Sequence, residues 1–347
     1  MIVVTSVLLP FLLFADKASV AQCNADPTGQ RDSTSAFAKC LAKLPAGDML
    51  VPAGKYRISG TISQHRNQSL IGVGSKASVL LCESTNAPCL VVADTAGGIN
   101  NYAVSNIENI GMEGPGTRNS SVGIYLGGDP AGTISPDKAF ADAVSLVGVR
   151  VSGFNHGVEW GNNAYADKIV RSLILGNSVG LYVPARLKNS GEAISITDSD
   201  IFNNKSSGIE DHSNFEWMIQ GTSFDYNSTA ILFYGSTIHA VNCHFEQDHG
   251  QVFFQPWGVA SLSIRDSEIL IQTSAGDDKY ILSTWPQALN LVIDNVSIWS
   301  NHAVRYFMRM QGRVTGAVTN LHGNGNRKIA AFSDDPAKFP PPPSQAF

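Results

Sequence analysis

The sequence is poor in charge and lacks basic runs. Charged residues make up 15% of its 347 positions, below the roughly 25% that is typical of soluble domains. The net charge is −5, and no run of basic residues is longer than Arg-Lys. A nucleic-acid-binding surface needs clustered lysine and arginine, so the sequence argues against a nucleic-acid partner.

Long apolar runs are also missing, apart from one at the N-terminus. Residues 2–14 are almost wholly apolar, but this run is too short to span a bilayer comfortably. Ser19-Val20-Ala21 places small residues where signal peptidase cleaves, although no positive charge precedes the run. We therefore predict a signal peptide over residues 1–21, a mature chain from Gln22 and a secreted or periplasmic protein without membrane contact. The alternative is a buried first strand.

No Cys-x-x-Cys occurs among the five cysteines, which argues against a structural zinc site. An exported chain favours disulfide bonds. The short polar loop between Cys82 and Cys89 favours a bond between these two. Cys23 with Cys40 is a further pairing that the sequence leaves open, and Cys243 is expected to be a buried thiol.

A repeat organises the middle of the chain. Seven segments share one template. A small or polar residue lies three positions before an apolar anchor, and a small or apolar residue lies two positions before it. The anchors are 21 to 29 residues apart and are Val151, Ile174, Ile201, Phe224, Phe245, Ile269 and Ile298. Such a period is typical of stacked repeats, and the alternation with β-branched residues indicates strands. A regular Leu-x-x-Leu-x-Leu frame is absent, so we predict an all-β parallel β-helix over residues 48–332; an irregular sandwich is the alternative.

The ends of a β-helix need caps, because its last strands expose apolar interior and unpaired edges. The spacing of Phe37, Cys40, Leu41 and Leu44 predicts a helix over Ser35–Leu44, with Asp32 and Ser33 as N-cap candidates. Residues 22–47 are thus expected to cap the N-terminal end. We expect residues 114–140 to form a long loop that walls a substrate groove, and the proline-rich residues 333–347 to be an extended tail.

The opening of the chain resembles that of known β-helix proteins. Asp26-Pro27-Thr28-Gly29, Asp32-Ser33-Thr34, the predicted helix and Val51-Pro52-Ala53-Gly54-Lys55-Tyr56 are similar to the start of pectate-lyase-superfamily proteins, which include glycoside hydrolases and phage tailspike depolymerases. The resemblance implies a right-handed parallel β-helix, monomeric or trimeric, and a polysaccharide substrate. The catalytic motifs of polygalacturonases, pectate lyases and alginate epimerases are absent, so no catalytic residue is carried over.

The candidate site follows from strand geometry. Side chains alternate along a strand and stacked coils lie ~4.8 Å apart, so the residues one before, three before and one after each anchor should point outward and form columns. One face then carries Asp198, Asp200, Asp225, Asn242, His244, Glu246, Asp266 and Glu268. Asp225 and Glu246 share a column. We predict the catalytic residues Asp225, Glu246, Asp200 and His244, and the substrate-binding residues Phe202, Trp299, Asn242, Glu268 and Tyr234. The alternative is a merely solvated face.

Paired carboxylates are what glycosidic-bond cleavage requires, and crowding separates their pKa values. The leading hypothesis is an exported enzyme that cleaves a glycan by hydrolysis or β-elimination. A non-catalytic glycan-binding protein and a tailspike-type module are the alternatives. We expect no cofactor and no metal; a lyase would instead use Ca²⁺ with Arg150, Arg171 or Arg265 near the base position. Glu210-Asp211-His212 is a second candidate cluster. The five Asn-x-Ser/Thr sequons are interpreted as turn composition.

Overall fold

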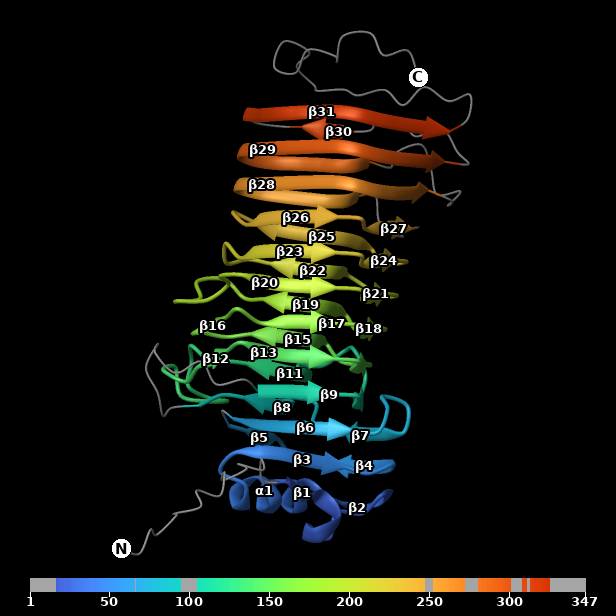
Figure 1. Ribbon diagram of the computed structural model, residues 1–347. Coiled ribbons are helices and arrows are strands. Elements are labelled where there is room, and N and C mark those ends of the chain that lie inside the picture. Colours follow the sequence, from blue (N-terminus) through green and yellow to red (C-terminus); the bar gives the residue numbers. More distant parts are fainter. Residues whose placement is uncertain are drawn as a thin grey trace, which may run out of the picture.

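The computed structural model describes residues 17–65, 67–94, 105–246, 252–271, 280–300, 308–310 and 313–324. The chain forms a parallel β-solenoid whose coils stack from the N-terminal helix α1 (Thr34–Lys43) at one end to β31 (Arg313–Asn324) at the other (Figure 1). The all-β prediction is therefore confirmed. Among the described residues, none of the helices is long and apolar enough to cross a membrane. The predicted tail, residues 333–347, and the first 16 residues lie outside the described residues.

Each of the first four coils of the repeat contains three short strands, and each strand pairs in parallel with its equivalents in the neighbouring coils. The first two full repeats are β13 (Val144–Val147), β14 (Arg150–Ser152) and β15 (His156–Trp160), then β17 (Lys168–Val170), β18 (Leu173–Leu175) and β19 (Val179–Val183). The next two are β20 (Ile194–Thr197), β21 (Asp200–Phe202) and β22 (Ser207–Asp211), then β23 (Glu216–Gln220), β24 (Ser223–Asp225) and β25 (Thr229–Tyr234). The coils that follow contain β26 (Thr237–Val241), β27 (His244–Glu246), β28 (Val252–Ile271), β29 (Tyr280–Ser300) and β30 (Met308–Met310).

The solenoid starts before the repeat does. Its early strands are β1 (Lys17–Ser19), β2 (Thr28–Asp32), β3 (Gly47–Val51), β4 (Gly54–Ile58), β5 (Ile62–Gln64), β6 (Gln68–Gly72), β7 (Ser78–Cys82), β8 (Pro88–Val92), β9 (Ser105–Glu108), β10 (Gly111–Glu113) and β11 (Val122–Leu126). A small separate sheet pairs β12 (Ala141–Asp142) with β16 (Ala164–Tyr165). The predicted loop over residues 114–140 was wrong in part, because the buried strand β11 divides it.

The predicted anchors form the core of the solenoid. Val151, Ile174, Ile201, Phe224, Phe245, Ile269 and Ile298 are register partners in successive coils, and each is at most 1% exposed. The rings of Phe224 and Phe245 stack with their centroids 5.3 Å apart. Continuous apolar stacking of this kind is what stabilises each coil on the next.

The small or polar residue of the template forms a corner, not an outward strand position as we predicted. Gly148, Arg171, Asp198, Gly221, Asn242, Asp266 and Asn295 all have φ between 48° and 61°. Glycine, asparagine and aspartate adopt this left-handed conformation most readily, which explains the composition of the position. The next residue of the template points inward; the Ser172 hydroxyl, for example, accepts a hydrogen bond from the Val149 N–H of the preceding coil (3.2 Å).

Three buried asparagines, Asn177, Asn204 and Asn227, form a ladder at the corner before the third strand of the coil. The Asn204 Oδ1 accepts the backbone N–H of Asn177, and the Asn227 Oδ1 accepts that of Asn204, both at 3.1 Å. Their side-chain amides donate to backbone carbonyls of the preceding coil. Two of these asparagines, Asn204 and Asn227, begin sequons, so their side chains cannot carry a glycan in the folded protein.

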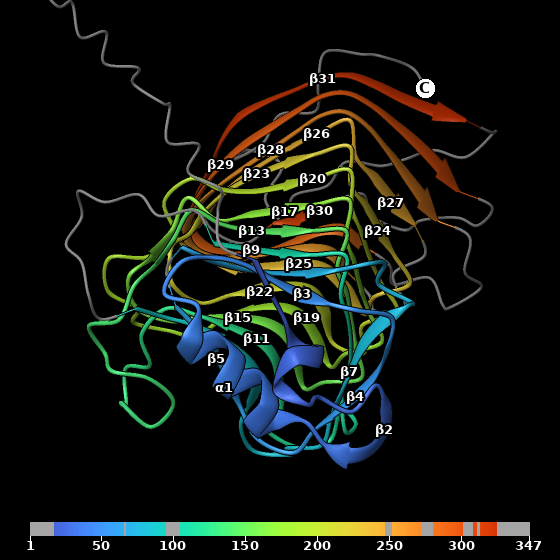
Figure 2. The ribbon, with the colours of Figure 1, turned by 60° about the horizontal axis from the view of Figure 1, so that its bottom comes forward.

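Helix α1 lies across the N-terminal end of the solenoid (Figure 2). It starts one residue earlier than predicted, and Phe37, Cys40 and Leu41 are buried against the first coils. The Asp32 Oδ1 accepts hydrogen bonds from the Thr34 backbone N–H (3.1 Å) and hydroxyl (2.7 Å), which satisfies a free donor of the first turn.

The cysteine predictions are confirmed. Cys23 is bonded to Cys40 and Cys82 to Cys89, with Cα atoms 5.8 and 5.7 Å apart. These distances are ordinary for disulfide bonds. Cys243 is a free, buried thiol.

Part of the predicted signal peptide lies within the fold. Strand β1 pairs with β3, and Val20 is fully buried. Cleavage before Gln22, which stays a prediction, would remove both contacts.

We expect a chain that starts at Gln22 to be less stable than one that starts at Lys17. Val20 alone contributes roughly 1.5–3 kcal/mol through its burial, and β3 would lose its pairing partner. Urea unfolding of the two chains measures the difference. Equal free energies of unfolding would show that residues 17–21 are dispensable and would contradict this prediction.

Candidate functional site

The site is built by the second strands of successive coils. The residue before each anchor lies in one column, which runs through Asp200, Ser223, His244 and Glu268. The residue after each anchor lies in another, which runs through Phe202, Asp225, Glu246, Leu270 and Trp299. Both columns agree with the register that the sequence predicted. The column positions therefore bring Asp225, His244 and Glu246 onto one face of the solenoid.

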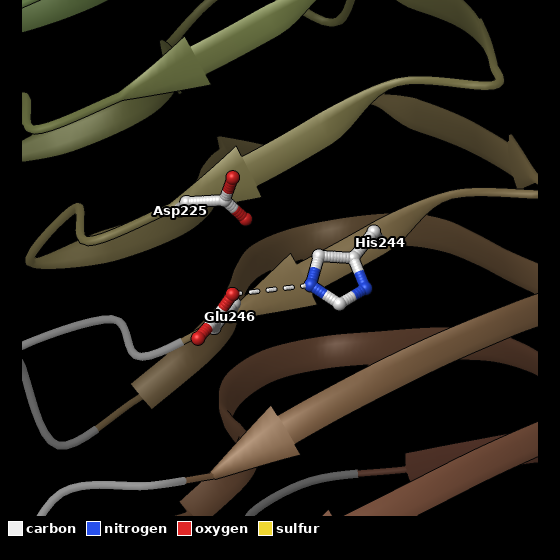
Figure 3. Close-up of side chains that lie close together, drawn as sticks. All are labelled: Asp225, His244 and Glu246. Atoms are coloured by element: carbon white, nitrogen blue, oxygen red, sulfur yellow. Dashed lines mark hydrogen bonds and ion pairs between the residues drawn. The ribbon is translucent and has the colours of Figure 1, made fainter.

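Asp225, His244 and Glu246 face one another across two coils (Figure 3). One oxygen of each carboxylate and one ring nitrogen of His244 all lie within 4.8 Å of one another. The His244 Nε2 is 3.4 Å from the Glu246 Oε2, and its Nδ1 is 3.1 Å from the Glu268 Oε2. His244 is thus held between two carboxylates, and its Nε2 side is directed into the cluster.

The surroundings of Asp225 change the pH at which its carboxylate takes up a proton. Its partial burial is the main cause that raises its pKa, and the negative charges of Glu246 and Asp200 raise it further. A hydrogen bond from the Ser223 hydroxyl (2.8 Å) and the charge of His244 oppose this effect. The net direction is upward, so Asp225 retains its proton to a higher pH than an ordinary aspartate does.

A hollow of about 480 Å³ adjoins the cluster on the side of the corner turns. It is lined by Gly221, Thr222, Ser223, Asn242, Cys243, His244, Asp266, Ser267, Glu268, Asn295, Ser297 and Trp299. Trp299 is 41% exposed, and an exposed aromatic side chain can stack on the apolar face of a sugar. His244 belongs to both the hollow and the carboxylate cluster and therefore joins the two.

The structure brings together most of the predicted site residues. Asn242, Glu268 and Trp299 line the hollow, and Phe202 is the column neighbour of Asp225. Asp200 lies one coil before Asp225, opposite Ser223. Tyr234 does not join them, because it lies at the end of β25, on another side of the coil, where it pairs with Trp257.

Two residues that form hydrogen bonds with the site carboxylates were not among the predicted site residues. Ser223 donates to the Asp225 carboxylate, and the Tyr226 hydroxyl donates to the Glu246 Oε1 at 3.5 Å. Tyr226 has φ of 57°, which is unusual for a bulky residue. The sequence signal for Ser223 was its place directly before an anchor, whereas the backbone turn that positions Tyr226 has no sequence signature.

Residues 114–140, which we predicted to wall the groove, lie elsewhere on the solenoid. The second half of residues 114–140 folds onto the coil corner beyond β15, where Gly128 and Asn162 exchange backbone hydrogen bonds of 2.8 and 2.6 Å. This corner carries β12 and β16 and lies across the solenoid from β24 and β27 (Figure 1). The first half contacts neighbouring coils, where the Lys205 ammonium donates a hydrogen bond to the Thr117 hydroxyl. None of the described residues of this segment forms a hydrogen bond or an ion pair with Asp225 or Glu246.

The cluster has the donor set of a divalent-cation site as well as that of an acid–base pair. One imidazole and two carboxylates suit a transition metal, and Glu268 on the far nitrogen of His244 resembles the carboxylate that commonly orients a metal-bound histidine. None of the described arginines forms an ion pair with Asp225 or Glu246: Arg150 pairs with Glu113 (3.6 Å), and Arg171 lies in a corner turn.

The parallel β-solenoid is the fold of pectate-lyase-like proteins, which are related to carbohydrate-active enzymes. The family model described as rhamnogalacturonase A/epimerase, pectate lyase-like matches residues 18–250. The chain belongs to this family. No curated protein matches the sequence significantly.

Several solved structures share the fold. DFA-IIIase (mutant C387A) from Arthrobacter chlorophenolicus A6 has a TM-score of 0.65 and 12% identity over 92% of this chain and 86% of its own. Tailspike protein 4 of bacteriophage CBA120 has a TM-score of 0.56 and 18% identity over 93% of this chain and 45% of its own. ORF18 of Geobacillus virus E2 has a TM-score of 0.50 and 12% identity over 92% of this chain. The chain spans only 62% of that protein. At such identities the similarity shows the fold alone.

Proposed function

We propose that this protein is an exported enzyme that hydrolyses a glycosidic bond of a polysaccharide at Asp225 and Glu246. The observation that carries the proposal is the close approach of two carboxylates of unequal character. Their oxygens lie within 4.8 Å of each other, and the pKa of Asp225 is raised by burial and by neighbouring charge. Family membership supports a carbohydrate substrate.

The separation of the carboxylates favours retention of anomeric configuration. Retaining glycosidases hold their carboxyl groups ~5–5.5 Å apart, whereas inverting ones leave ~6.5–9.5 Å for a water molecule. Asp225 donates its proton to the leaving oxygen while Glu246 attacks the anomeric carbon and forms a glycosyl ester. Asp225, now a carboxylate, then takes a proton from water, and the hydroxide displaces Glu246. His244 and Tyr226 orient the Glu246 carboxylate.

β-Elimination is less well supported by the same geometry. It requires a base beside the sugar C5 and a cation that neutralises the uronate, and no described arginine reaches the cluster. A panel of polysaccharides tests the proposal, with new reducing ends and the absorbance of unsaturated uronate measured separately. Reducing ends without that absorbance are expected, and the first product should keep the anomeric configuration by NMR. Unsaturated products would show a lyase, and the absence of any product would show a glycan-binding protein.

The pH dependence of the rate should change when the negative charge of Asp200 is removed. A general acid must be protonated, so the rate falls as pH rises through the raised pKa of Asp225. Asp200→Asn removes a negative charge that raises this pKa, so the alkaline limb of the pH–rate profile should move to lower pH. Asp137→Asn, an exposed position on another part of the surface, serves as the control. An unmoved limb in Asp200→Asn would contradict the assignment of Asp225 as the acid.

A further inference from the structure

A second polar cluster lies on a different side of the solenoid, on the outer face of β15, β19 and β22. It consists of His156, Glu159, Tyr182, Glu210 and His212, here called the histidine–tyrosine cluster. The register places Glu159, Tyr182 and Glu210 opposite one another in three successive coils. Coils are ~4.8 Å apart, so the tyrosine stands midway between two glutamates that are roughly 10 Å apart along the axis.

Each glutamate of the cluster is paired with a histidine of its own coil. The His156 Nδ1 is 2.6 Å from the Glu159 Oε2, and the His212 Nε2 is 3.0 Å from the Glu210 Oε1. The Glu210 Oε2 also accepts a hydrogen bond from the Ser207 hydroxyl at 2.9 Å. The side chains of both glutamates are only 15% and 21% exposed. Both carboxylates are therefore fixed in position.

Aromatic contacts hold the Tyr182 ring in position, but they do not involve its hydroxyl. The ring stacks on the His156 ring with centroids 3.8 Å apart, and it forms a T-shaped contact with the His212 ring, whose centroid is 6.0 Å away. The structure gives the Tyr182 hydroxyl no hydrogen-bond partner among the described residues. Burial raises the pKa of Tyr182, as do the charges of Glu159 and Glu210, so this hydroxyl remains a donor at neutral pH.

These features suit one class of ligand. A stacked aromatic pair offers an apolar surface, and a fixed donor and fixed carboxylate acceptors beside it match the hydroxyl groups of a sugar ring. Two glutamate charges repel an anionic sugar. We propose that the histidine–tyrosine cluster is a second binding site for a neutral sugar unit, distinct from the Asp225–Glu246 pair. The proposal assigns it no reaction step and does not depend on hydrolysis by that pair.

Affinity electrophoresis of the Asp225→Asn protein tests this site, with gels that contain inulin, dextran, galactomannan or polygalacturonate. At least one of the three neutral polysaccharides should retard the protein. In that gel, Tyr182→Ala should weaken binding about 10-fold or more, and Tyr182→Phe about 2–10-fold, the usual effect of one hydrogen bond. Gln255→Ala, two coils beyond Glu210 in the same column, should bind like its parent.

Each outcome of the binding measurement either supports the second sugar site or overturns it. The proposal is overturned if none of the neutral polysaccharides retards the protein, if polygalacturonate alone does so, or if both Tyr182 variants bind like their parent. Thermal unfolding checks each variant; should Tyr182→Ala fail to fold, Tyr182→Phe and His212→Gln carry the test. Residual turnover of Asp225→Asn would count against the proposed hydrolysis and would leave this binding measurement unaffected.

Discussion

Asp225→Asn and Glu246→Gln should each lower turnover of the cleaved polysaccharide by about 100-fold or more, the usual cost of losing a general acid or base. Both substitutions keep the size of the side chain and remove its acid–base function. Asp225→Asn removes the proton donor, whereas Glu246→Gln removes the group that attacks the anomeric carbon. The measurement is kcat on the polysaccharide that the panel identifies.

The two variants should also differ from each other. A substrate with a good leaving group, such as an aryl glycoside, needs no proton from Asp225 for the first step, so it should restore formation of the glycosyl ester in Asp225→Asn but not in Glu246→Gln. Asp137→Asn and Glu108→Gln are matched controls at positions away from the cluster. Normal turnover in both site variants, with folding confirmed by thermal unfolding, would remove the catalytic assignment of this pair.

Asn204→Ala should lower the free energy of unfolding by about 3–5 kcal/mol. The substitution removes the acceptor of the Asn177 backbone N–H and the donor to the Ile174 carbonyl. Both partners are buried, and each unsatisfied group costs about 1–3 kcal/mol. The Asn227 Oδ1 also loses a donor. Since each rung of the ladder joins adjacent coils, the loss weakens the stacking on which the solenoid depends.

Urea unfolding followed by circular dichroism measures this effect. Asn86→Ala is the control, because Asn86 is exposed and, within the described part of the chain, accepts a single 3.3 Å side-chain hydrogen bond from Ser84; its effect should be below about 0.5 kcal/mol. A loss below about 1 kcal/mol in Asn204→Ala would mean that water replaces the missing amide, and the ladder would then not be a main source of stability.

The repeat in the sequence determined the fold and the register. Stacked coils bury an apolar anchor every 21 to 29 residues in one continuous core, and alternation then decides which neighbours face outward. This is why the sequence alone predicted that Asp225 and Glu246 share a column and that the seven anchors, the first of which is Val151 and the last Ile298, lie in the core. The sequence could also suggest the two disulfide bonds, because each joins cysteines that are close in the chain.

Only the tertiary structure decided where the coils bend. The residue three before each anchor was expected to lie in a strand, but a single left-handed residue turns the chain there. Asparagine and glycine favour turns in general, so their presence does not show where a strand ends. The same limit explains why residues 114–140 do not wall the site: a glycine-rich stretch does not reveal on which corner it packs. The histidine–tyrosine cluster, too, depends on packing, because Glu159, Tyr182 and Glu210 are far apart in the chain and become neighbours only when the coils stack in parallel.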